Sequence, residues 1–180
     1  TKGTLQDNDS RWQKMINTTE DLLVTSIEKL RKIAPVEALL IQGNHDWVTS
    51  YHIMRYLGGY YRKEKNVTID SAPTSRKYRD FGVNLIGFCH GDKEKKRLFG
   101  LMQVEVPELW GKSKYREFHV GHNHTRITEE ENGIVKRSIP SAAAKSSWEY
   151  NVGYMSLAGS MAYVWHEEKG LYNMIPIDIL

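Results

Sequence analysis

The chain has 180 residues, of which 40% are hydrophobic and 26% are charged, and its formal net charge at pH 7 is +3. This length predicts one well-packed domain rather than two full ones, and the mixture of charges excludes a wholly disordered chain. The small net charge neither requires nor excludes a polyanionic partner.

Cys89 is the only cysteine. A single cysteine excludes an intramolecular disulfide framework and favours a reducing compartment, so we expect a cytoplasmic protein. No apolar stretch approaches the roughly 20 residues of a membrane span, so we expect no membrane partner.

The first element expected along the chain is a helix over residues 10–34. Ser10 and Gln13 have the spacing of a capping box, and the apolar residues after them recur at helical spacing until Pro35 ends the pattern. The other elements expected in chain order are a strand over 36–42, a helix over 48–57 that ends at Gly58-Gly59, strands over 66–70 and 83–89, a helix over 93–103 and a strand over 116–121.

The last third of the chain predicts two β-hairpins. Asn132-Gly133 separates two β-like runs, and a similar pattern surrounds Lys169-Gly170. Helices alternate with strands in the first part of the chain and hairpins dominate later. The pattern therefore predicts a single α/β domain over residues 1–180, with mixed sheets.

Four of the seven histidines directly follow apolar runs: His45, His90, His122 and His124. Because ligands of α/β proteins gather outside the carboxyl ends of strands, we expect these imidazoles to converge on one site. In an extended segment, His122 and His124 would also point the same way. The remaining histidines, His52, His119 and His166, have no such context and are interpreted as surface or partly buried structural residues.

Each of these motifs taken alone has a simpler interpretation as a turn, because Asn and Asp are common turn residues. The occurrence of three such motifs at three strand ends favours a functional site. The sequences G-N-H-D at 43–46, His90-Gly91 and G-H-N-H at 121–124 together resemble the calcineurin-like metallophosphoesterase family. The resemblance implies a four-layer αββα sandwich, in which two mixed β-sheets are flanked by helices.

The resemblance also implies a centre of two divalent metal ions, with Mn, Fe or Zn suited to imidazole and amide ligands. Asn44, His90 and His122 would ligate one metal, and His124 would help to ligate the other. His45 would be the catalytic residue that faces the phosphate, with Asp46 orienting its imidazole. The implied reaction is hydrolysis of a phosphomonoester or phosphodiester substrate.

The chain departs from the family pattern in its first half. The family supplies a D-x-H motif and then a G-D motif whose Asp bridges both metals, whereas this sequence has no D-x-H, and its only Gly-Asp is Gly91-Asp92. We therefore expect that part of the fold precedes Thr1, and that the 180-residue chain by itself binds metal poorly and is weak or inactive.

Three alternatives remain open. A nuclease of the same family would use basic clusters to bind nucleic acid, although solvated surface is the simpler interpretation of those clusters. A non-catalytic scaffold would keep the fold and bind a partner. A structural zinc site is disfavoured because such sites usually include cysteine thiolates. The basic clusters are Arg62, Lys63 and Lys65; Arg76, Lys77 and Arg79; and Lys93, Lys95, Lys96 and Arg97.

Overall fold

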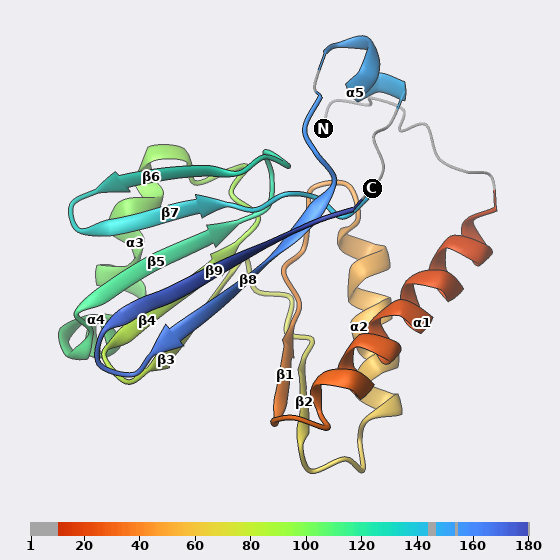
Figure 1. The fold of residues 1–180 in the computed structure, drawn as a ribbon, viewed down its shortest axis with the longest axis horizontal. Coiled ribbons are helices and arrows are strands. Elements are labelled where there is room, and N and C mark those ends of the chain that lie inside the picture. The colour runs from red at the N-terminus through yellow and green to blue at the C-terminus, as the bar shows by residue number, and fades with distance from the viewer. Residues whose placement is uncertain (1–10, 144–146, 154, 180) are drawn as a thin grey trace. The chain divides into compact units, whose positions relative to one another are not determined.

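The structure is a computed structural model that describes residues 11–143, 147–153 and 155–179. The chain divides into two compact units, one ending at Thr74 and the other beginning at Ser75. Figure 1 shows a mixed α/β fold with helices beside sheets in both units, which confirms the predicted fold class. That residues 1–180 form one domain stays a prediction.

The N-terminal unit packs two helices against a pair of parallel strands (Figure 1). Strand β1 pairs in parallel with β2, with Val36 opposite Val67. Its apolar core is formed by Ile27, Leu40, Ile53, Met54, Leu57, Tyr61 and Val67. The elements are α1 (Trp12–Leu30), β1 (Val36–Leu39), α2 (Trp47–Tyr60) and β2 (Val67–Asp70).

The predicted end of the second helix at Gly58-Gly59 is wrong, because α2 continues to Tyr60. Leu57 and Tyr61 are buried on either side of the glycines, and the Tyr61 hydroxyl donates a hydrogen bond of 3.3 Å to the Val24 carbonyl of α1. Burial of these two side chains outweighs the roughly 1 kcal/mol that each glycine costs in a helix. The first helix ends at Leu30, earlier than predicted, and Ser10 of the expected capping box lies outside the described residues.

The C-terminal unit is built on a five-stranded mixed sheet in the order β3–β4–β5–β7–β6. The three central strands β4, β5 and β7 are parallel, and each edge strand is antiparallel to its neighbour. The strands are β3 (Arg76–Phe81), β4 (Asn84–Cys89), β5 (Tyr115–Val120), β6 (Ile127–Glu131) and β7 (Ile134–Ser138).

The two faces of this sheet are covered differently. On one face, Phe118 and Val120 of β5 pack into a core with Leu98 and Met102 of a helix. On the other face, the ring of His119 lies 4.4 Å from that of Tyr163 in a terminal hairpin. The covering elements are η1 (Lys95–Arg97), α3 (Leu98–Glu105) and α4 (Pro107–Lys112) on the first face, and β8 (Gly159–His166) with β9 (Gly170–Asp178) on the second.

Both predicted hairpins are confirmed. Asn132 and Gly133, with φ angles of 53° and 74°, join β6 to β7. Positive φ at both central residues is the backbone of the turn that Asn-Gly favours. Strands β8 and β9 pair antiparallel, and the hairpin closes with His166 opposite Gly170.

Strand β3 is not predicted by the sequence, because its residues R-K-Y-R-D-F look like a solvated basic cluster. That interpretation is wrong for this cluster, since Lys77 is only 4% exposed and Arg76 forms ion pairs with Glu94 and Glu105. Charged residues are typical of an edge strand, where they oppose pairing with other chains. Helix α4 and the short helix α5 (Ser147–Asn151) are also absent from the predictions. No helix in the described ranges is long and apolar enough to cross a membrane.

Candidate metal centre

His90 and His122 follow the carboxyl ends of two neighbouring parallel strands, as predicted. Strands β4 and β5 pair with Cys89 opposite Val120, so the residues that follow them leave the sheet side by side. The His90 carbonyl accepts hydrogen bonds from the N–H groups of Gly121, at 3.1 Å, and His122, at 2.9 Å. These two bonds fix one loop against the other and bring the imidazoles together.

The ring nitrogens of the two histidines face each other. His122 Nδ1 lies 3.2 Å from His90 Nε2, with the ring centroids 5.0 Å apart and the rings inclined at 74°. Two imidazoles on one tetrahedral zinc, with Zn–N bonds of about 2.0–2.1 Å, place their nitrogens roughly 3.3 Å apart. The observed pair therefore fits two ligands of one cation, and the exposed side of His122 leaves the pair open to ions.

Residues 121–124 form a turn rather than the extended segment in which His122 and His124 were expected to point the same way. The N–H of His124 donates to the Gly121 carbonyl at 3.3 Å, and His124 itself has a left-handed φ of 53°. Its Nδ1 atom lies 3.2 Å from Oε1 of Glu149 in α5. His124, the predicted ligand of the second metal, therefore already contacts a carboxylate through one of its two ring nitrogens.

Asn44, His45 and Asp46 lie in the N-terminal unit, between β1 and α2. Asp46 is the N-cap residue of α2, and its carbonyl accepts the N–H of Ser50 at 2.8 Å. Within the described part of the chain, the Asp46 carboxylate makes no capping hydrogen bond to this helix. That this segment meets the histidines of the C-terminal unit in one site stays a prediction.

The other histidines behave as structural residues. His119 is buried, lies 3.4 Å from Glu117 and packs its ring against Phe88 and Tyr163. His166 is the last residue of β8, and its Nδ1 atom accepts a hydrogen bond of 3.1 Å from the N–H of Glu168. His52 is exposed and packs edge-on to Tyr51. His52 and His166 match the interpretation made from the sequence, whereas His119 is more deeply buried than predicted.

Glu149 is the residue of this region that the sequence did not reveal. It lies in the aromatic segment S-S-W-E-Y-N, which contains no spacing that indicates a contact with His124. In the residues that the structure describes, no group of three or more His, Cys, Asp or Glu side chains is assembled to hold a metal ion. The His90–His122 pair therefore brings two possible ligands together, and no third His, Cys, Asp or Glu side chain of the described residues joins them.

No protein-family model and no curated protein sequence matches the chain. Among solved structures, the chain is similar to a double mutant of Vps29 from Entamoeba histolytica, with a TM-score of 0.46, 13% identity, and coverage of 100% of this chain and 94% of that one. It is also similar to wild-type Vps29 of the same organism in complex with Zn²⁺, with a TM-score of 0.42, 14% identity, and coverage of 86% and 88%. Sequence identities and TM-scores this low do not assign the chain to a family.

Proposed function

We propose that this protein is a metal-dependent phosphoester hydrolase in which His90 and His122 bind one of two divalent cations. The approach of their ring nitrogens to 3.2 Å is the observation that carries the proposal. Without a cation, a separation of this size fits an N–H···N hydrogen bond in which one neutral ring donates to the other, and a bound cation would take the place of the shared proton. Asn44 is the third proposed ligand of this cation, and His124 is a proposed ligand of the second.

The cations, when bound, neutralise the charge of the phosphate ester and lower the pKa of a coordinated water. In the chain itself, His45 donates a hydrogen bond or proton to an ester oxygen, and Asp46 accepts a hydrogen bond from the His45 imidazole. Two features support these roles. His45 is exposed beyond the end of β1, and the Asp46 carboxylate is not used as a helix cap among the described residues.

Nucleic acid is the second candidate substrate, and one basic cluster favours it. Lys93, Lys95 and Lys96 follow His90 closely in the chain and are exposed. The cluster of β3, by contrast, is occupied by ion pairs within the fold. A nuclease would therefore bind DNA through the 93–96 segment, with an affinity that falls steeply as salt rises, because phosphate contacts release counterions. Affinity that does not depend on salt would argue against this substrate.

Metal titration of the 180-residue chain tests the proposed function. We expect Mn²⁺ and Zn²⁺ to bind weakly but measurably by calorimetry, and Mn²⁺ to support slow hydrolysis of bis(p-nitrophenyl) phosphate. The His90→Ala/His122→Ala double variant should lose both properties. The control is His52→Ala, which removes an exposed histidine of the N-terminal unit and should bind metal as the wild type does. Absence of metal binding to the wild-type chain at millimolar concentration would refute the proposal and favour a non-catalytic scaffold.

A further inference from the structure

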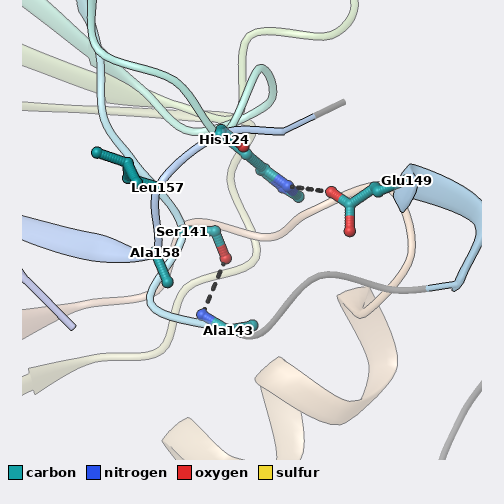
Figure 2. Close-up of a pocket in the computed structure, with 7 residues that line it drawn as sticks. His124, Ser141, Ala143, Glu149, Leu157 and Ala158 are labelled. Carbon is teal, nitrogen blue, oxygen red and sulfur yellow. Dashed lines mark hydrogen bonds and ion pairs between the residues drawn. The ribbon is translucent and has the colours of Figure 1, made fainter. Parts of the chain in front are cut away.

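Helix α5 contributes a carboxylate to one wall of a small pocket beside His124. The pocket has a volume of about 50 Å³, and Figure 2 shows Glu149 and His124 pointing toward each other across it. Oε1 of Glu149 lies 3.2 Å from Nδ1 of His124, and the Glu149 side chain is 21% exposed. The residues that line the pocket are His124, Ser141, Ala143, Glu149, Ser156, Leu157 and Ala158.

The chemistry of this contact determines which nitrogen of His124 carries the proton. An ionised carboxylate only accepts hydrogen bonds, so Nδ1 of His124 must be the donor. In the neutral ring the proton then occupies Nδ1, and the lone pair occupies Nε2. A histidine fixed in this way presents Nε2 to a cation, and its orientation is held by the carboxylate behind it.

The backbone of His124 adds a second constraint. His124 is one of the few described non-glycine residues with positive φ, and its N–H is bonded to the Gly121 carbonyl. A left-handed backbone costs a non-glycine residue roughly 1–2 kcal/mol, so this geometry is maintained against a local preference. The Gly121 carbonyl thus fixes the Cα position of His124, and Glu149 fixes the direction of its ring.

We propose that Glu149 is a positioning residue that holds His124 in its Nδ1–H tautomer with Nε2 directed to a divalent cation. This inference rests on the proposed function, because the cation is the one assigned there to His124. It adds helix α5 to the metal centre, although this helix carries none of the motif residues. An ordinary surface ion pair predicts neither a fixed tautomer nor an effect on metal affinity.

Two substitutions of Glu149 separate positioning from charge. Glu149→Gln keeps a side-chain carbonyl that can accept a hydrogen bond from the Nδ1–H group, whereas Glu149→Ala removes every side-chain acceptor at this position. Long-range ¹H–¹⁵N correlation spectra of the metal-free chain report the tautomer of each histidine directly. We expect the Nδ1–H tautomer of His124 in the wild type and in Glu149→Gln, and conversion to the Nε2–H form in Glu149→Ala. An unchanged tautomer in Glu149→Ala overturns the inference.

Metal affinity provides the second measurement, with Mn²⁺ and Zn²⁺ alone as the probes. Loss of a residue that orients a ligand typically lowers metal affinity by roughly 10–100-fold, which is the loss expected for Glu149→Ala. Glu149→Gln should lose less metal affinity than Glu149→Ala. The control is Glu130→Ala, which removes an exposed carboxylate from strand β6 and should bind metal as tightly as the wild type does. Equal affinities for Glu149→Ala and Glu130→Ala overturn the inference. If the wild type binds no metal, the proposed function fails, and the tautomer of His124 alone decides the role of Glu149.

Discussion

A Cβ atom placed on Gly91 would lie 2.9 Å from the Cβ atom of Val120, closer than real side chains approach each other. Gly91 follows His90 directly and has a φ of 93°, so it is the point where the chain turns away from β4 beside the end of β5. The position of His90 next to His122 therefore depends on the absence of a side chain at residue 91.

Gly91→Ala should lower the free energy of unfolding by about 2–4 kcal/mol, combining the strain of a left-handed alanine with overpacking against Val120. Urea denaturation measures this loss. Gly133→Ala is the control, because Gly133 also has positive φ but has open space where the Cβ would lie. It should cost only the backbone strain, about 1–2 kcal/mol. Equal losses in the two variants would show that the contact with Val120 carries no energy.

Substitution of His45 should separate catalysis from metal binding. Since His45 is proposed to face the phosphate, His45→Ala should lower the rate of metal-dependent hydrolysis roughly 10²–10⁴-fold, as expected for loss of a general acid. In a calorimetric titration, the affinity for Mn²⁺ should stay near the wild-type value. His122→Ala should instead lower this affinity. Loss of metal from His45→Ala would show that this residue is a ligand and that its assigned role is wrong.

An ion pair between the buried Glu117 and the partly buried Arg137 predicts sensitivity to acid. Arg137 Nε lies 2.6 Å from Oε2 of Glu117, and Arg137 Nη2 lies 3.0 Å from Oε1. Burial alone would raise the pKa of Glu117, but hydrogen bonds from His119 and Arg137 outweigh burial and hold this pKa below its ordinary value of 4.5. The stability that results is present above the ordinary pKa and is lost as pH falls through the lowered pKa of the folded state.

Urea midpoints measured from pH 7 to pH 3 should therefore fall more steeply for the wild type than for Glu117→Gln, which has no carboxylate to protonate at residue 117. At neutral pH, Arg137→Met should destabilise the protein by about 3–5 kcal/mol, because it leaves the Glu117 charge buried without its main partner. The Glu117→Gln/Arg137→Met double variant should lose less stability than Arg137→Met alone, because it leaves no buried charge at residue 117. Parallel pH profiles for the wild type and Glu117→Gln would contradict this account.

The single thiol, Cys89, should be unreactive while the sheet is intact. It is 1% exposed at the end of β4, and burial, with the nearby Glu94 charge adding to it, raises the pKa of the thiol to about 12. Because the thiolate is the reactive form, reaction with dithiobis(nitrobenzoate) at pH 8 should require opening of the sheet. The labelling rate should rise with urea in parallel with unfolding. Rapid labelling of the native chain would show that the end of β4 opens locally.

The residues at strand ends were predictable because local pattern specifies them. Apolar runs that stop at Gly or His identify the ends of β4 and β5 without any knowledge of the fold, whereas β1 ends at Leu39, earlier than the predicted end at residue 42. Asn132-Gly133 specifies its hairpin for a similar reason, since few other dipeptides tolerate positive φ at both positions. Sequence alone therefore determined the α/β class and the candidate ligands His90 and His122.

Features that depend on residues far apart in the sequence were decided only by the tertiary structure. Whether R-K-Y-R-D-F is a solvated cluster or the edge strand β3 depends on Glu94 and Glu105, which lie on another part of the chain. The contact of the His124 ring with Glu149 depends on the turn at 121–124 and on a carboxylate that α5 supplies from a distant part of the sequence. The local sequence pattern does not predict such contacts, because their energy comes from groups that are close together only in the folded chain.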